Sequence, residues 1–431
     1  MKRMIPFLVL AFVSTALSLC VPATAGEETP FEVGVGMRII TPDPLLPVSG
    51  GLGAPEPVTE KRGDITVRAM VFRKGETVVA FVGLDLLGFP SVLAERVRKQ
   101  VPEIPGDHIL MGASHTHSAP DCYGFPLPSG GFTGDLNYMQ FVCEKAAEAV
   151  REAFSKLEPA SLRVNTDRAA DRIAYNYYAP ALYDPSMSVI QAVRSDGSVI
   201  GTLVNYAIHP EVLGNEAGIL SPDAIGPMYD RIEQKAGGMA MFMNGAQGGM
   251  VTADNRDLSS KPDPVRAVWS DLRTWDECLR IGHLMADEAL RIIEKAPQQA
   301  DPRLVCHSRD IRFPVESPLM WAVVVGSPLK YPHNDDHSIT SRVNFVELGN
   351  AQILTIPGEA LPNIGFFLKR KMKGEHNLLF GLTNDAFGYI LTRVDYASFD
   401  RYNYVSRTSL GEMTGEILIE QSLQMIEAAG R

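Results

Sequence analysis

The chain has 431 residues and a formal net charge of −11 at pH 7. This acidity argues against nucleic acid or an anionic membrane surface as a principal partner. The sequence contains no Walker loop, GxGxxG turn or HExxH helix, which removes the commonest nucleotide-binding and protease classes. The length exceeds the roughly 100–200 residues of one ordinary domain, yet α/β enzymes often do so, and we expect one large domain.

Residues 1–25 have the pattern of a secretory signal peptide, with a basic start, an apolar run over 5–19 and small residues before a cut after Ala25. The apolar run is too short for a comfortable membrane span. We therefore expect a secreted or periplasmic mature chain, residues 26–431, without a transmembrane segment. Lipid attachment at Cys20 is the alternative, and the bulky leucine directly before it argues against that reading.

Four cysteines remain in the mature chain: Cys122, Cys143, Cys278 and Cys306. In an oxidising compartment they can form two disulfides in any of three pairings, although a chain of this length does not need disulfides for its core. None belongs to a CxxC pair, which argues against zinc held by cysteines.

Runs of apolar and alternating residues predict strands at 33–40, 65–72, 77–84, 108–111, 187–194, 199–208, 239–243, 304–313, 343–348, 352–356 and 378–382. Amphipathic spacing and capping residues predict helices that end near residues 100, 156, 235, 295, 372 and 428. The strand, helix, strand order from 77 to 111 indicates a parallel crossover. We find no internal repeat. The pattern predicts an α/β fold with a mixed, largely parallel central sheet flanked by helices.

A histidine pair lies just beyond the predicted strand at 108–111. In an extended backbone alternate side chains share a face, so His115 and His117 point the same way. Two such imidazoles can ligate one metal ion, or one can ligate while the other holds a bound water. Such a pair also arises by chance in many chains, so it does not establish a metal site alone.

Other polar residues also follow apolar strands, and the ends of strands in one sheet can converge in space. Each is ordinary on its own: a single histidine is more often a hydrogen-bonded core residue, and a single glutamate often begins a helix. Together they predict a shared site built from Asp85, His115, His117, His209, Glu359 and Tyr389.

Five segments, in order, resemble the neutral and alkaline, non-lysosomal ceramidase family. They are an opening strand at 33–41, the double-histidine motif at 114–118, a third histidine in 206–210, Pro357-Gly-Glu359, and 381–384 with Tyr389 and Thr392. Each segment is weakly specific alone, but the ordered set spans most of the mature chain. The resemblance implies a ceramidase-like catalytic domain over 26–431.

The resemblance implies one Zn²⁺ ion held by His115, His209, Glu359 and Tyr389. It also implies that His117 lies close to the metal-bound water or the scissile group and that Arg172 meets the substrate. We add Asp85 as an acid that orients a metal-binding histidine, and Asn384 of the matched motif as a further residue behind the ligands. Nitrogen and oxygen ligands without a thiolate suit a catalytic zinc, which polarises carbonyls and activates water.

Two departures from the family pattern affect the substrate. Val251 stands where the family has a serine that contacts the substrate, so Thr252 is the nearest hydroxyl and Gln247 is an alternative hydrogen-bonding group. The chain is also shorter than members of the family, and we expect it to lack their C-terminal immunoglobulin-like domain.

The sequence therefore predicts a secreted zinc-dependent hydrolase of amide bonds, of the N-acylsphingosine amidohydrolase type, acting on a small-molecule or lipid-like amide of the kind found in sphingolipid metabolism. Two alternatives stay open. The same fold and metal can hydrolyse a soluble ester, lactone or sugar derivative, or the pocket can serve a non-catalytic binding protein.

Overall fold

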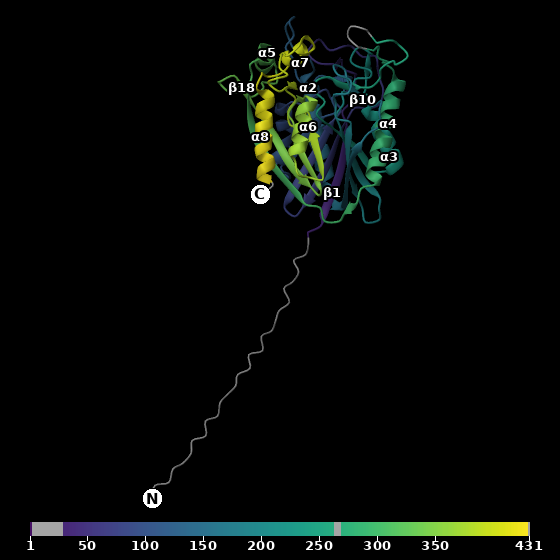
Figure 1. The fold of residues 1–431 in the computed structure, drawn as a ribbon, viewed down its shortest axis with the longest axis vertical. Helices are drawn as coiled ribbons and strands as arrows, with labels where there is room; N and C mark the ends of the chain where they lie inside the picture. Colours follow the sequence, from purple (N-terminus) through teal and green to yellow (C-terminus); the bar gives the residue numbers. More distant parts are fainter. Residues whose placement is uncertain (2–28, 263–268, 430–431) are drawn as a thin grey trace.

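The computed structural model describes residues 1, 29–262 and 269–429 (Figure 1). The predicted signal peptide, its cleavage after Ala25 and the alternative lipid attachment at Cys20 fall outside the described residues.

The first part of the chain forms a sheet of antiparallel strands closed by one parallel strand. Strands β1 (Phe31–Ile39), β4 (Thr66–Lys74) and β5 (Thr77–Leu84) pair antiparallel in sequence order. Helix α1 (Ser91–Arg98) then crosses over, and β6 (Ile109–Ala113) pairs parallel with β5. The predicted parallel crossover is confirmed.

The middle of the chain repeats this topology. Strands β9 (Ser161–Arg168), β11 (Ser186–Val193) and β12 (Val199–Tyr206) pair antiparallel. Helix α3 (Ile225–Ala236) crosses over, and β14 (Met239–Asn244) pairs parallel with β12.

The last part of the chain repeats this topology a third time. Strands β17 (Leu304–Pro314), β18 (Ser338–Leu348) and β19 (Ala351–Thr355) are antiparallel, and β21 (His376–Phe380) follows helix α6 (Pro362–Lys371) to pair parallel with β19. The three repeats are not apparent in the sequence because they share a backbone topology and not a residue pattern.

A longer helix follows each repeat along the chain and packs on the outside of that repeat. These are α2 (Leu136–Ser155), α4 (Trp275–Glu294) and α8 (Thr414–Ala429). Figure 1 shows α8 at one edge of the molecule and α3 with α4 at the opposite edge, with strands between them.

Short elements connect the longer ones, and most of them lie at the end of the molecule where the strands run out; the two exceptions pair with the first residues of β1 and β9. They are β2 (Val48–Ser49), β3 (Glu60–Lys61), β7 (Ala119–Pro120), β8 (Glu158–Pro159), β10 (Ala174–Asn176), β13 (Ile219–Leu220), β15 (Val251–Ala253), β16 (Gln298–Gln299), α5 (Pro318–Gly326), β20 (Glu359–Ala360), β22 (Tyr389–Ile390) and α7 (Asn403–Arg407).

The three sheets share one central core and each has an outer core of its own. Phe81 of the first sheet, Leu203 of the second and Phe380 of the third belong to the central cluster, and all are fully buried. Separate clusters lie between each sheet and its helices. Strands such as β5, β12 and β14 are covered on both faces and read as nearly continuous apolar runs.

The α/β class, with mixed sheets flanked by helices in a single domain, is confirmed. Within the described residues the strands form three main sheets, each with one parallel pair, in place of the one largely parallel sheet that we expected. The reason is the short turns, such as Asp196-Gly197, which join neighbouring strands as antiparallel hairpins. Strand β9 and helix α5 were not predicted from the sequence.

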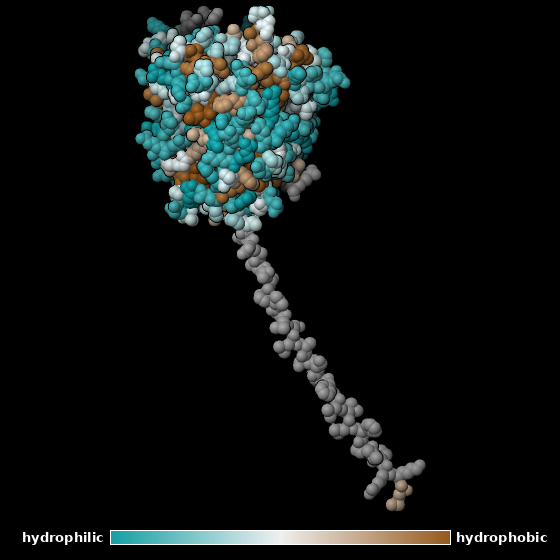
Figure 2. Space-filling model, turned by 180° about the vertical axis from the view of Figure 1, so that it is seen from behind, coloured by the Kyte–Doolittle hydropathy of each residue, from teal (hydrophilic) through white to brown (hydrophobic). Residues whose placement is uncertain are grey.

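The four cysteines that the structure describes are free thiols, with Cys122, Cys143 and Cys278 buried and Cys306 partly buried, so neither of the two possible disulfides is present among them. None of the described helices combines the length and apolar character needed to cross a membrane. Polar residues cover most of the face in Figure 2, with apolar residues in small groups.

Asn384 ties the first repeat to the third. Its side-chain oxygen accepts a 2.8 Å hydrogen bond from Arg98 Nη2, and its Nδ2 donates to Asn344 Oδ1 at 2.8 Å. Its backbone N–H donates to the carbonyl of Met111 at 2.7 Å. The side chain is fully buried, so it holds the repeats together at the end where the site forms.

We expect Asn384→Ala to destabilise the protein by about 3 kcal/mol, because it leaves buried Arg98 and Asn344 groups without their partner. Urea unfolding followed by circular dichroism measures the change. Asn137→Ala, on the exposed side of α2, is the control and should change the free energy of unfolding by less than about 0.5 kcal/mol. Equal effects of the two substitutions would contradict this role.

Candidate metal centre

Residues from all three repeats converge where the strands end. His115 and His117 follow β6, and His209 follows β12. Glu359 and Tyr389 lie in the short strands β20 and β22, which come after β19 and β21 and pair parallel with these two residues in register. The prediction that these distant segments meet is therefore correct as a matter of geometry.

His115 is fixed by the chain that follows β5. Its backbone N–H donates to the carbonyl of Leu86 at 2.9 Å, and its Nδ1 donates to the carbonyl of Leu87. Its φ is 71°, an uncommon conformation for a residue other than glycine. Its other ring nitrogen, Nε2, lies 3.6 Å from Glu359 Oε2.

His209 is held in the same manner by another segment. Its Nδ1 donates to the carbonyl of Val251 at 2.8 Å, and its Nε2 lies 3.1 Å from Glu359 Oε2. Because a carbonyl only accepts, each Nδ1 carries the proton, and with neutral rings the Nε2 lone pairs point at one place. Metal-binding histidines are commonly oriented by such a bond from the second ring nitrogen.

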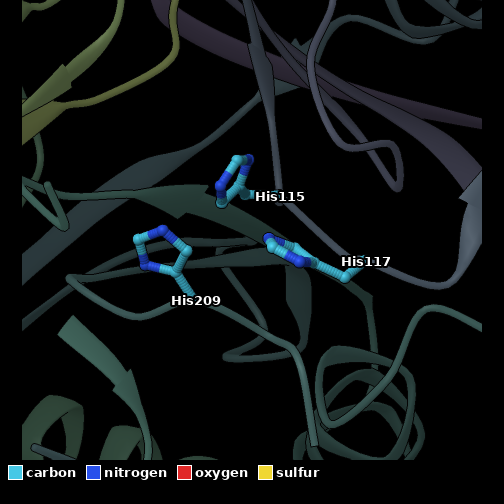
Figure 3. A group of neighbouring side chains, drawn as sticks. All are labelled: His115, His117 and His209. Carbon is cyan, nitrogen blue, oxygen red and sulfur yellow. The ribbon is translucent and has the colours of Figure 1, made fainter. Parts of the chain in front are cut away.

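The third imidazole completes a compact group. One ligand atom from each of His115, His117 and His209 lies within 4.8 Å of the others, and Figure 3 shows the rings gathered around a common space. His117 Nδ1 lies 3.4 Å from Glu211 Oε2. Its Nε2 is buried and has no hydrogen-bond partner among the described residues, as expected of a group that meets a ligand.

Tyr389 is 6 % exposed and stands in register beside Glu359. Its hydroxyl donates to Met250 Sδ at 3.4 Å. Burial and the charge of Glu359 raise the pKa of Tyr389 well above its usual value, so the phenol keeps its proton in the metal-free protein. His115, His209, Glu359 and Tyr389 offer two imidazoles, a carboxylate and a phenol, and these nitrogen and oxygen donors fit a divalent metal ion.

Burial and mutual charge set the protonation of this group. Burial lowers the pKa of His115 and of His117 to about 3. Burial raises the pKa of Glu359, but the imidazoles of His115 and His209 outweigh it and lower that pKa to about 2. Burial also lowers the pKa of His209, yet the hydrogen bond and charge of Glu359 prevail and leave it raised.

Two of the residues predicted to support the ligands lie elsewhere. Asp85 accepts hydrogen bonds from Thr66 and from the Tyr229 hydroxyl, because its side chain turns toward β4 and α3. The expectation that Asp85 orients a histidine is therefore wrong, and the Leu87 carbonyl orients His115 instead. Asn384 joins strands, as described above.

The predicted substrate-binding residues do not line the cavities beside the cluster, although the backbone of Thr252 pairs with that of His209. Arg172 Nε lies 3.6 Å from Asp254 Oδ2, and Nη2 donates to the carbonyl of Arg256. Of the residues that the structure describes, Arg172, Thr252 and Gln247 are absent from the lining of either cavity beside the histidines. Gln247 is fully buried.

The glycine-rich segment after β14 packs against β20, the strand that contains Glu359. A Cβ at Gly248 would lie 2.1 Å from the carbonyl oxygen of Glu359, and the Gly248 N–H donates to Ala360. The glycine is thus needed for a close backbone contact with β20 and not with a ligand.

Two cavities open beside the cluster. The larger, about 940 Å³ with its open mouth, is mainly apolar and reaches His115, His117, Glu359 and Tyr389. The smaller, about 680 Å³ with its mouth, contains charged residues and reaches His117, His209 and Tyr389. A concave, mainly apolar space with a few convergent polar groups is typical of a small-molecule site.

Solved structures of similar fold are ceramidases, although no family model matches the sequence. The neutral ceramidase of Pseudomonas aeruginosa has a TM-score of 0.73 and 16 % identity, covering 93 % of this chain and 75 % of that one. A ceramidase complexed with C2 gives a TM-score of 0.72 and 17 % identity over the same shares. The chain therefore has a ceramidase-like fold.

Several residues that form the site were not predicted from the sequence. Leu87 and Val251 act through backbone carbonyls, which no side-chain pattern signals. Glu211 lies two residues after His209, and a charged residue so close in sequence to a predicted ligand could have indicated a role at the site. Arg273 lines the charged cavity from a loop that carried no motif.

Metal affinity should depend on pH through His209. Below its raised pKa this imidazole holds a proton that a metal ion must displace, whereas His115 is already neutral above about pH 3. We expect affinity to fall about tenfold per pH unit below the pKa of His209 and to level off above it. Competition with a chromophoric chelator from about pH 5 to about pH 9 measures this, and an affinity that does not change with pH would refute it.

Proposed function

We propose that the protein is a zinc-dependent hydrolase of amide bonds. The observation that carries the proposal is the pair of imidazoles whose Nδ1 atoms are fixed by backbone carbonyls while their Nε2 atoms meet one oxygen of Glu359. The ceramidase-like fold and the adjoining apolar cavity support an amide with an apolar part as the substrate.

The proposed ligands are His115, His209, Glu359 and Tyr389, with zinc chosen because nitrogen and oxygen donors without thiolate suit a catalytic ion. When bound, such an ion polarises a carbonyl and lowers the pKa of water. Without the ion, the buried carboxylate of Glu359 is balanced by the proton on His209.

His117 is proposed to move the proton during hydrolysis. Glu211 Oε2 faces its Nδ1, which favours the tautomer with a proton on Nδ1 and a lone pair on Nε2. That Nε2 is buried, has no partner in the described part of the chain, and belongs to a side chain that lines both cavities. It can accept a proton from water and return it to the departing nitrogen.

Roles for Thr252, Gln247 and Arg172 in binding substrate remain predictions, as do export from the cytoplasm and the extent of the catalytic domain. The main competing function is hydrolysis of a soluble ester, lactone or sugar derivative at the same site. The charged residues of the smaller cavity favour that alternative, because they suit a polar substrate.

We expect His115→Ala and Glu359→Ala to lower kcat/KM for an amide substrate by about 100-fold or more, because each removes a proposed ligand. His307→Ala, exposed on β17, is the matched control and should keep activity. A panel of fatty amides and matched esters, assayed with zinc-loaded protein, measures this.

Full amide hydrolysis by either ligand variant, with zinc still bound, would overturn the ligand assignment. Hydrolysis of the esters alone would favour the competing function.

A further inference from the structure

The two cavities meet at the metal centre. Gly50, His117, Tyr389 and Tyr404 line both of them. On the apolar side the centre contributes His115 and Glu359, and on the charged side it contributes His209. A carbonyl at the centre therefore has one space on each side for its two substituents.

The two spaces differ sharply in chemistry. Apolar side chains from several elements line the larger cavity, among them Leu87, Phe125, Val323, Val324 and Phe387. The smaller cavity contains four charged or amide side chains, namely Glu211, Asn215, Glu216 and Arg273, beside the apolar surfaces of Met250 and Tyr404. One substituent of the substrate therefore meets hydrocarbon, while the other meets carboxylates and a guanidinium.

Arg273 is seated at the wall of the charged cavity. Its Nη1 donates to the carbonyl of Glu211 at 3.4 Å, and its Nη2 lies 3.5 Å from Asp271 Oδ2. Gly214, with φ 65°, makes room for it, because a Cβ there would lie 2.5 Å from Nη1. Both contacts are long and a guanidinium has five N–H donors, so donors remain for a ligand.

We propose that the substrate is an amide of an apolar acyl group and a small hydroxylated amine, and not an amide with two long alkyl chains. This inference rests on the proposed amide hydrolysis. A hydroxyl can donate to Glu211 or Glu216 and accept from Arg273. A second alkyl chain in that cavity would remove water from three charged groups without replacing its hydrogen bonds, which is costly.

Cleavage of the amide is compatible with an amine on the charged side. As the carbon–nitrogen bond breaks, the carbonyl carbon gains the hydroxyl of water and the nitrogen gains the remaining proton. His117, proposed to supply that proton, lines both cavities, and Glu211, which faces its Nδ1, lies on the charged side, so a nitrogen bound at the junction is within reach of this imidazole. The products are a carboxylic acid and a free hydroxylated amine.

Three amides, of which the first two are isomers, test the assignment with zinc-loaded protein. They are N-octanoylethanolamine, N-glycoloyl-octylamine, which reverses the two arms, and N-octanoyl-octylamine, which has two alkyl chains. We expect kcat/KM for the first to exceed that for each of the others by at least about tenfold. Equal or faster hydrolysis of the two-chain amide would overturn the inference while leaving amide hydrolysis intact.

Binding to the metal-free protein separates this inference from the proposed function. If esters are cleaved and no amide is, amide hydrolysis fails, and calorimetry with the same three amides decides the substrate class. Tighter binding of N-octanoylethanolamine supports the two-sided site. Tighter binding of N-octanoyl-octylamine overturns it.

Arg273→Met tests the charged cavity directly. We expect the ratio of kcat/KM for N-octanoylethanolamine to that for N-octanoyl-octylamine to fall about tenfold, because the hydroxyl loses a charged donor. Arg303→Met is the matched control, since Arg303 is exposed and pairs with Glu347 at the start of β17. An unchanged ratio in Arg273→Met would overturn the placement of the amine.

Discussion

The site depends on one carboxylate oxygen, Glu359 Oε2, that faces two imidazoles at 3.1 and 3.6 Å. An ionised carboxylate buried to this degree is stable only with a compensating positive charge. In the metal-free protein burial lowers the pKa of His209, but Glu359 outweighs burial and raises that pKa, so a protonated His209 is the group that can supply the charge. A divalent ion can take over this role, and the backbone carbonyls that hold both Nδ1 atoms keep the Nε2 atoms aimed at it.

The threefold repeat explains how such distant residues meet. In each repeat the third and fourth strands are parallel, so their carboxyl ends reach the same end of the molecule. The three sheets pack around one shared core, which brings these ends together. Each repeat thus contributes to the centre: His115 from the first, His209 from the second and Glu359 from the third.

The polar side chains at the strand ends could be predicted from the sequence, whereas the strand pairing and the contacts that orient these side chains could not. His115, His209 and Glu359 follow apolar runs that mark buried strands, so their convergence was predictable. The division into three sheets was not, because apolar runs do not tell which strands pair or in which direction. Asp85 was misassigned because the sequence shows that the residue follows β5 but not where its side chain points. That side chain faces Thr66 and Tyr229. The orienting carbonyl of Val251 has no sequence signature, since every residue carries one.

The most direct test of this account is the structure of the zinc-loaded protein with the metal located by anomalous scattering at its absorption edge. The account predicts one ion per chain bound by the Nε2 atoms of His115 and His209, by Glu359 and by Tyr389, with His117 close by and not coordinated. Zinc absent from this position after loading, or bound by His117 in place of Glu359, would contradict it.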